Sequence, residues 1–146
     1  MNAKVEEIMT ASPVTASRHT TVAHARATLA SHGFSALPIV DPDGTPVGIV
    51  TTSDLVAPDL KETTPLSALA GEKLYTVPQY EDVSVAARMM RNHRIHHLLV
   101  THEKRVVGLV SSFDLLRLVE EHRFVAKAPP TATAKKKGAR AKQERA

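Results

Sequence analysis

The second half of this chain repeats the first, and this duplication limits the possible folds more than any other feature of the sequence. Residues 14–56 correspond to residues 75–116 at an offset of 61 positions, which falls to 60 after a turn. Identical residues recur at the first offset: Val22 and Val83, Ala25 and Ala86, His32 and His93, and Leu37 and Leu98. A single gap confined to a turn indicates duplication followed by drift of a loop, so we expect two similar units.

Each copy has the pattern of a strand, a helix, two strands joined by a turn, and a final helix. Thr21 and Asp82 are suited to cap the first helix of each copy, because their side-chain oxygens can accept a free backbone N–H. Apolar and small residues then recur at steps of three, four and three, which places them on one helix face. Gly33 is suited to end the first of these helices.

The remaining elements complete a mixed fold. Three strands are predicted in each copy: residues 14–16, 37–40 and 46–51, and residues 75–77, 95–100 and 106–111. Asp-Pro-Asp-Gly at residues 41–44 predicts a tight turn. Short helices begin near Ser53 and Ser112, and Pro58 stops the first whereas the second can run to about Phe124. We predict an α+β fold of two β-α-β-β-α repeats that pack sheet to sheet with pseudo-symmetry.

The repeats divide the chain into three parts. We assign residues 1–60 to the first repeat, residues 61–126 to the second and residues 127–146 to a C-terminal tail. Each repeat has one apolar sheet face and too little surface to bury by itself, so neither should fold alone.

The tail carries the basic character of the chain. It holds seven basic residues and one acidic residue, whereas residues 1–126 hold 12 basic and 14 acidic residues. Its opening Pro129-Pro130 and its lack of apolar periodicity predict disorder. A solvated extension is one interpretation, and contact with nucleic acid or another polyanion is the alternative.

Composition excludes several classes of protein. Aromatic residues make up 3% of the chain, so the core must be aliphatic and a protein that stacks bases on aromatic rings is disfavoured. The absence of cysteine excludes disulfides and thiolate metal sites. No stretch approaches the roughly 20 apolar residues that span a bilayer, and the N-terminus lacks an apolar signal segment. We therefore expect a cytoplasmic protein that is not associated with a membrane.

Three recurring features point to a known family. Residues 5–9 read Val-Glu-Glu-Ile-Met and are expected to form a short lead-in helix, and residues 37–41 read Leu-Pro-Ile-Val-Asp. A string of glycine, two apolar residues, Thr or Ser, and then Asp three positions later occurs in both copies: Gly48, Thr51 and Asp54, and Gly108, Ser111 and Asp114. The chain over residues 5–122 resembles the CBS family in its tandem arrangement, the Bateman module. The resemblance implies a nucleotide-binding cleft between the repeats.

Each residue of the repeated string can be given a structural role in binding a ligand. Glycine lets a strand approach a ligand closely, and a hydroxyl at the start of a helix can bond a phosphate. Asp54 and Asp114 lie in the first helical turn, where a carboxylate can accept the hydroxyls of a ribose. The alternative is an ordinary helix start, in which Thr51 or Ser111 caps the helix and the acid offsets its dipole.

The resemblance also implies walls for the adenine ring. In the CBS family the first two strands line the base with apolar side chains and backbone polar groups. The positions of this chain that match fall in both copies: Val14, Thr15 and Leu37, and Tyr75, Val77 and Leu98.

Histidines cluster in the second copy. If residues 95–100 form a strand, His96 and His97 point to opposite faces and cannot both face one ligand. The resemblance implies a basic residue near the ligand phosphates in this strand, where the first copy has the uncharged Ser35 and Ala36. We therefore predict unequal clefts, with the phosphate better held by the second and binding tighter below about pH 6.5.

Other roles for these histidines remain open. They can be surface residues, with His93 packed on its helix face as His32 is in the first copy. A zinc site is disfavoured, because no cysteine and no nearby acid completes it, so we assign no metal.

The chemistry available is recognition rather than catalysis. No Ser-His-Asp order, phosphate-loop lysine or His-Glu-x-x-His string is present, so we expect no enzyme and no required cofactor. We predict a regulatory module whose ligand is an adenine nucleotide of the AMP or ATP type, ADP, NAD or S-adenosylmethionine. It should pair as a homodimer through the helices after Ser53 and Ser112 and act on a target enzyme or transporter. The alternatives are a ligand-free interaction scaffold and a polyanion-associated regulator that uses the basic tail.

Overall fold

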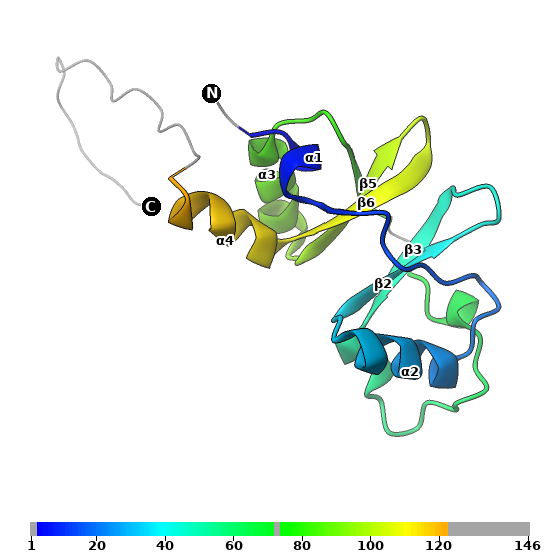
Figure 1. Ribbon diagram of the computed structural model, residues 1–146. Helices are drawn as coiled ribbons and strands as arrows, with labels where there is room; N and C mark the ends of the chain where they lie inside the picture. The colour runs from blue at the N-terminus through cyan, green and yellow to red at the C-terminus, as the bar shows by residue number, and fades with distance from the viewer. Residues whose placement is uncertain (1–2, 72–73, 123–146) are drawn as a thin grey trace, which may run out of the picture.

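The structure, a computed structural model, describes residues 3–71 and 74–122 (Figure 1). The predicted basic tail, residues 127–146, and the predicted helix end at Phe124 lie outside the described residues. The elements of the first half are α1 (Val5–Ile8), β1 (Thr10–Ala11), α2 (Val22–His32), β2 (Ala36–Val40), β3 (Pro46–Thr51) and the 3₁₀ helix η1 (Thr52–Leu55). Those of the second half are the 3₁₀ helix η2 (Leu66–Ala68), β4 (Thr76–Pro78), α3 (Val83–His93), β5 (His97–His102), β6 (Arg105–Ser111) and α4 (Ser112–Glu120).

The predicted helix caps are confirmed in one copy and altered in the other. The Thr21 side chain accepts a hydrogen bond from the His24 backbone N–H at 3.2 Å, and Gly33 ends α2 in the left-handed region at φ 68°. Asp82 precedes α3 but makes no capping bond. Its carboxylate instead accepts a hydrogen bond from Lys4 Nζ at 2.7 Å, so this cap prediction was wrong. Charge pairing with a residue far away in the sequence takes precedence over the local cap.

The strands of the described residues form two unequal sheets, and five of them correspond to predicted strands, whereas β1 was not predicted. One has the order β1-β6-β5-β4, with β4 parallel to β5 and the other pairs antiparallel, and the second consists of the antiparallel pair β2 and β3. The strand predicted at residues 14–16 is reduced to one parallel bridge between Ala16 and Ile39. Its counterpart in the second copy, Val77 opposite Val100, belongs to a full strand pair.

Each half of the chain inserts its lead-in segment into the core of the other half. Here the lead-in segments are residues 3–9, which contain α1, and residues 64–70, which contain η2. Figure 1 shows α1 beside α3 of the second repeat. Val5 and Ile8 are buried in the core built by α3, α4, β4, β5 and β6, and Leu66 is buried in the core built by α2, β2 and β3.

The two insertions use the same backbone contacts. The bonds recur at the offset of 61 residues: Val5 N–H to Glu81 O (2.8 Å) and Leu66 N–H to Thr20 O (2.8 Å), and Val83 N–H to Ala3 O (3.0 Å) and Val22 N–H to Thr64 O (2.9 Å). The predicted division after residue 60 therefore separates the repeats along the sequence but not in their packing.

Gly48 and Gly108 make room for these lead-in segments. A Cβ atom at Gly108 would collide with Met9 Sδ and lie 3.2 Å from the Thr10 carbonyl oxygen. A Cβ atom at Gly48 would lie 3.3 Å from Ala70 Cβ. The expectation that these glycines admit a ligand is therefore corrected, because the close neighbour of each is another part of the chain.

The two repeats meet through the sheet faces that point away from their helices. Leu98 and Val100 of β5 face the helical core, so Leu99 between them points to the opposite face. Leu99 is nevertheless only 1% exposed, which shows that this face is covered as well. The Val106 backbone N–H donates to the Gly44 oxygen at 2.9 Å and joins the tips of the two hairpins. The predicted α+β fold with sheet-to-sheet packing is confirmed.

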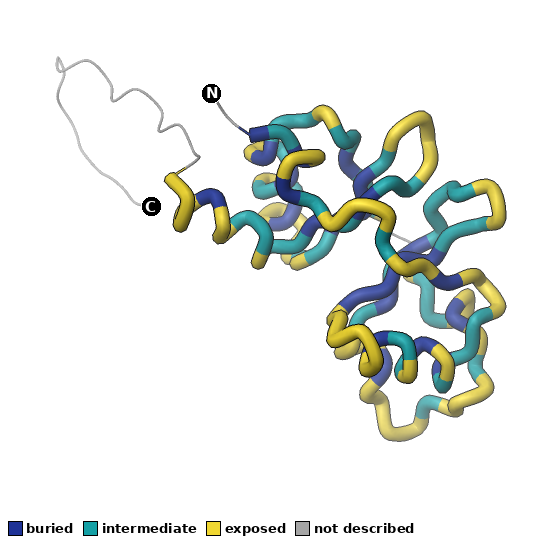
Figure 2. Tube along the Cα trace, viewed as in Figure 1, coloured by how far each residue is buried: buried dark blue, intermediate teal, exposed yellow. Residues whose placement is uncertain are grey.

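The helices cover the outer sides of this pair of sheets. Figure 2 shows buried residues along the strands and several exposed residues along α4. Within residues 3–71 and 74–122, none of the helices is long and apolar enough to cross a membrane.

The exchange of lead-in segments predicts a large cost for Leu66→Ala. The Leu66 side chain is 0% exposed, so its truncation should lower the free energy of unfolding by about 2–5 kcal/mol. Ser67→Ala at the exposed neighbouring position is the control and should change it by about 0.5 kcal/mol or less. Urea denaturation of both variants checks this, and equal stability of the two would contradict the exchange.

Candidate functional site

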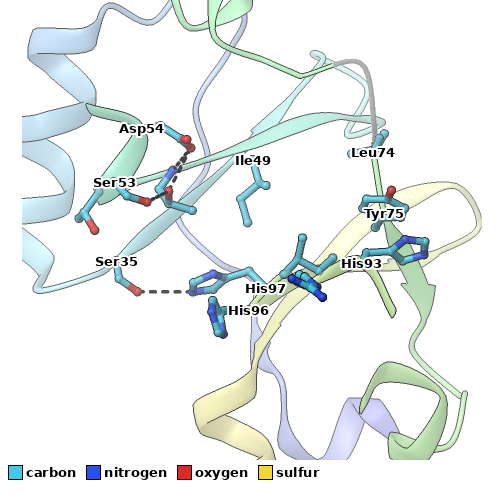
Figure 3. A pocket seen from close by; sticks show the side chains of 13 residues that line it. Ser35, Ile49, Ser53, Asp54, Leu74, Tyr75, His93, His96 and His97 are labelled. Carbon is cyan, nitrogen blue, oxygen red and sulfur yellow. Dashed lines mark hydrogen bonds between the residues drawn. The ribbon is translucent and has the colours of Figure 1, made fainter. Parts of the chain in front are cut away.

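A cavity between the two repeats is shown in Figure 3. We call it the first cleft, and its volume is about 600 Å³. Its lining residues come from both halves: Ser35, Ile49, Thr51, Thr52, Ser53 and Asp54, and Leu74, Tyr75, His93, Arg94, Ile95, His96 and His97. The volume falls within the range of sites for small molecules and cofactors.

A second, smaller cleft lies between the repeats and holds the other acid. Its volume is about 210 Å³. It is lined by Thr10, Pro13, Val14, Gly33, Phe34, Ser35, Ala36 and Pro38, and by His97, Leu109, Ser111 and Asp114. The two clefts are therefore unequal in size, and the larger one holds more of the histidines.

Each cleft combines the acid of one repeat with the wall of the other. Thr51 and Asp54 of the first repeat face Tyr75 of the second across the first cleft. In the second cleft Asp114 of the second repeat faces Val14 of the first. Two-sided clefts of this kind exist only when the repeats are packed together, so a ligand in either cleft would contact both.

Asp54 caps η1 with one oxygen and leaves the other free. Its Oδ2 accepts hydrogen bonds from the Thr51 backbone N–H at 2.8 Å and from Thr51 Oγ1 at 3.0 Å. Among the residues that the structure describes, Oδ1 of Asp54 accepts no hydrogen bond, and the side chain lines the first cleft (Figure 3). The capping role and the ligand-binding role are therefore compatible, because each uses a different oxygen.

Asp114 makes the equivalent arrangement at the start of α4. Its Oδ2 accepts a hydrogen bond from the Ser111 backbone N–H at 2.8 Å, and its own backbone N–H donates to Ser111 Oγ at 3.1 Å. This reciprocal capping box holds the carboxylate at the second cleft and leaves Oδ1 without a bond among the described residues.

An aromatic and apolar wall faces Asp54 across the first cleft. The rings of Tyr75 and His93 are stacked, with centroids 4.0 Å apart and an angle of 22° between their planes. Ile49, Leu74 and Ile95 add apolar surface (Figure 3). A flat apolar slot opposite a carboxylate suits a molecule that joins a planar base to a sugar.

The expectation that His96 and His97 point to opposite faces required residues 95–100 to form one strand, and this condition is not met. The chain leaves α3 at Arg94 in the left-handed region (φ 55°), and β5 begins only at His97. His96 therefore lies in a bend before the strand, so the rule that successive side chains of a strand point to opposite faces does not apply to it. Both side chains line the first cleft (Figure 3).

His97 also forms part of the partition between the two clefts. It lines both of them, as does Ser35 of the first repeat. The two residues are joined by a hydrogen bond of 3.4 Å between Ser35 Oγ and His97 Nε2, drawn in Figure 3. A ligand in one cleft therefore lies next to a side chain that also faces the other cleft.

Burial favours the neutral form of His97. Desolvation lowers the pKa of this imidazole from 6.5, and the nearby His96 lowers the pKa further. The Asp114 carboxylate acts in the opposite direction, since its negative charge favours the imidazolium. Any further negative charge next to His97 would add to the effect of Asp114.

Four of the predicted adenine contacts lie outside both linings. Leu37, Val77 and Leu98 are buried in the two cores, because their positions in β2, β4 and β5 point toward the helices. Thr15 is exposed and belongs to the lining of neither cleft. Gly48 and Gly108 also lie outside both linings.

Several lining residues were missed by the sequence analysis. Phe34 and Ile95 occupy equivalent positions in the loops after the first helix of each copy, and Pro13 and Leu74 are equivalent too. The offset of 61 residues relates both pairs, so the duplication could have identified them. The spacing of apolar residues could not identify them, because they lie in neither a helix nor a strand.

The described residues contain no group of three or more His, Cys, Asp or Glu side chains placed to hold a metal ion. The histidines of the first cleft therefore do not form a metal site by themselves within that part of the chain.

The model of the CBS domain matches residues 5–58 and 66–121. Each match starts within a lead-in segment and ends shortly after the helix that contains the repeated Asp. Among solved structures, the CBS domain pair of protein MJ0100, in complex with 5′-methylthioadenosine and S-adenosyl-L-methionine, has a TM-score of 0.77 and 28% sequence identity. The similarity covers 84% of this chain and 99% of that one.

Two further relatives differ from each other in length: one is about as long as this chain, and the other is a much longer enzyme. Hypoxic response protein 1 of Mycobacterium tuberculosis is 28% identical over 82% of this chain and 87% of its own length. Its crystal structure, with two coordinated zinc ions, has a TM-score of 0.72 and covers 79% of this chain and 98% of that one. A homoserine O-acetyltransferase of Methanosphaerula palustris is 31% identical over 79% of this chain, which spans only 24% of that enzyme.

The environment of His97 predicts that stability falls as the pH is lowered. Its pKa is lower in the folded chain than in the unfolded chain, so the unfolded chain binds the proton more readily below about pH 6.5. The stabilisation present above that pH is therefore lost as the pH falls through the folded pKa. His97→Gln should lose less thermal stability than the parent between pH 7.5 and pH 5.5.

The exposed His19 provides the matched control for this titration. His19→Gln should follow the parent in the same thermal melts, because its side chain lies outside both clefts. Identical pH profiles for His97→Gln and the parent would show that His97 does not contribute.

Proposed function

The chain belongs to the CBS domain family, and on this basis we propose that it is a regulatory module that binds an adenosine-type nucleotide between its two repeats. CBS domain pairs are generally regulatory rather than catalytic. The protein would then sense its ligand without changing it chemically.

One observation carries this proposal. The repeated acids, Asp54 and Asp114, both line clefts whose opposite walls come from the other repeat. Each acid has one oxygen engaged in a helix cap and another oxygen available at the cleft. A helix cap alone does not require its acid to face a cavity shared by two repeats, whereas a ribose site does.

The first cleft, which contains Tyr75 and the histidines of the second copy, is the better candidate for a phosphorylated ligand, in line with the expectation that the cleft of the second copy holds the phosphate better. Asp54 would accept the ribose hydroxyls, and the stacked Tyr75 and His93 would flank the base. His96, His97 and Arg94 lie along the same cleft and would face the phosphates. The smaller second cleft has only His97 as a basic group and suits a ligand with less charge.

Ligand chemistry in a relative supports this class of molecule. The MJ0100 domain pair holds 5′-methylthioadenosine and S-adenosyl-L-methionine, which share an adenosyl group. A carboxylate at the ribose and an apolar slot at the base suit that shared part. A regulatory effect further requires the ligand to prefer one arrangement of the protein over another, and a homodimer of this chain is the arrangement that we propose it controls.

Asp54→Asn tests the ribose contact in the first cleft. Asparagine retains the helix cap but carries no charge, so folding should be preserved while affinity for the preferred nucleotide falls about tenfold or more. Calorimetric titration with AMP, ATP, NAD, S-adenosylmethionine and methylthioadenosine measures this. Asp114→Asn is the matched variant for the second cleft, and it should leave the stronger affinity for phosphorylated ligands unchanged.

Failure of every one of these nucleotides to bind or to raise the melting temperature would favour the ligand-free scaffold. Unchanged affinities in both variants would remove the acids from the site even if a nucleotide binds.

The histidines predict that phosphorylated ligands bind more tightly at lower pH. The phosphate diesters of NAD stay ionised between pH 7.5 and pH 5.5, so a change in affinity over this range reports on the protein. We expect NAD affinity to rise about threefold or more, provided that NAD is among the ligands bound, and methylthioadenosine affinity to stay nearly constant. The gain should be smaller in His97→Gln, and an equal gain for both ligands would contradict the assignment.

A further inference from the structure

The two clefts are built from equivalent positions of the repeats but differ in charge. The acid, the hydroxyl residue before it and the apolar wall of the first cleft all correspond, at an offset of 60 or 61 residues, to lining residues of the second cleft. Three uncharged residues of the second cleft correspond to basic residues of the first: Gly33 to Arg94, Ser35 to His96, and Ala36 to His97. Selectivity between the clefts therefore depends on these three positions.

Arg94 supplies the permanent positive charge of the first cleft. Among the described residues that line this cleft there is no other arginine and no lysine. Burial lowers the pKa of His97 from 6.5, so this imidazole is uncharged at pH 7.5, whereas a guanidinium stays charged. Within the part of the chain that the structure describes, the Arg94 guanidinium makes no hydrogen bond and no ion pair. Its five N–H donors are therefore available to a ligand.

The backbone at Arg94 has a conformation that glycine adopts most readily. α3 ends at Arg94 with φ 55° and ψ 46°, and the Arg94 backbone N–H donates to the Met90 oxygen. Gly33 ends α2 in the same left-handed region, with φ 68° and ψ 27°. In this region the Cβ atom of any other residue comes too close to the following carbonyl oxygen. Arginine at this position therefore lowers the stability of the fold relative to glycine.

The location of this left-handed residue connects it with binding. Among the described residues, the positions other than glycine with positive φ are Ser12, Arg94, Glu103, Lys104 and His122. Arg94 lines the first cleft, whereas the other four lie outside both linings. A residue that costs stability, carries an unpaired charge and lines a cleft is typical of a residue retained for binding rather than for folding.

A purely structural role of the Arg94 charge is the alternative. A cation at the C-terminal end of a helix interacts favourably with the helix dipole. However, α3 already has Arg91 and His93 in its last turn, and α2 ends at Gly33 without an arginine. The dipole alone therefore does not account for a cation at this left-handed position.

We propose that the residue that ends the first helix of each repeat decides which ligands the adjoining cleft accepts, and that Arg94 selects phosphorylated ligands for the first cleft. A guanidinium can bond two phosphate oxygens at once through parallel N–H groups. Gly33 leaves the second cleft to adenosine derivatives without phosphate. The inference rests on the proposed function, because it takes nucleotides as the occupants, and it adds the residue that discriminates between them.

ATP and adenosine test this selectivity, because the two ligands differ only in their phosphates. In calorimetric titrations of the full chain at pH 7.5, Arg94→Gly should bind ATP about tenfold or more weakly than the parent and adenosine with nearly the same affinity. Arg91→Gln removes a charge from an exposed position of the same helix outside both linings, so it should bind both ligands as the parent does. Unchanged ATP affinity in Arg94→Gly would overturn the inference.

Gly33→Arg transfers the charge to the second cleft. A Cβ atom at Gly33 has no neighbouring heavy atom within 4 Å, so an added side chain has room. In the background of Asp54→Asn, which weakens the first cleft, Gly33→Arg should raise the affinity for ATP about tenfold and leave that for adenosine nearly constant. ATP affinity that does not rise in this folded double variant would contradict the proposed role of the position.

Thermal melts without ligand test the cost of the backbone conformation separately. Arg94→Ala and Arg94→Gly both remove the charge, but only glycine relieves the left-handed backbone, so Arg94→Gly should melt about 3–5 °C above Arg94→Ala. Equal melting temperatures would show that the arginine carries no conformational cost and would overturn the inference. A parent chain that binds neither ATP nor adenosine would refute the proposed function as well, whereas a parent that binds ATP and an Arg94→Gly variant that binds it equally well would refute the inference alone.

Discussion

The exchange of lead-in segments between the two repeats is the constraint on which the rest of the structure depends. Val5 and Ile8 complete the core of the second repeat, and Leu66 completes the core of the first. Each repeat is too small to bury enough apolar surface without this contribution. The exchange therefore makes the pair of repeats the folding unit, and it holds the two sheets in one relative position.

That fixed position creates the clefts. A carboxylate at the start of η1 or α4 would stabilise its helix in an isolated repeat just as well, because capping is local. Only the packed pair sets Tyr75 across from Asp54 and Val14 across from Asp114. Each of these two aspartates thus stabilises its helix with one carboxylate oxygen, and its other oxygen is available to contact a ligand.

The departures from symmetry give the two halves different properties. Histidines and an arginine of the second copy line the first cleft. The first copy instead contributes the uncharged Ser35 and Ala36 to the second cleft. The early end of η1 leaves an apolar groove beside α2, whereas the full length of α4 exposes apolar side chains. Duplication followed by small local changes therefore accounts for two clefts with different linings and for different outer surfaces on the two repeats.

The duplicated pattern by itself determined the α+β repeats, most strand positions and the acids of the site, because periodicity and capping are local. The tertiary structure decided which repeat each lead-in segment joins, since Val5 and Leu66 would suit either core equally well as apolar residues. It also decided that Leu37 and Leu98 face helices rather than a ligand, because alternation along a strand does not reveal which face is which. The bend at His96 and the partition formed by His97 and Ser35 likewise arise from contacts between residues far apart in the sequence.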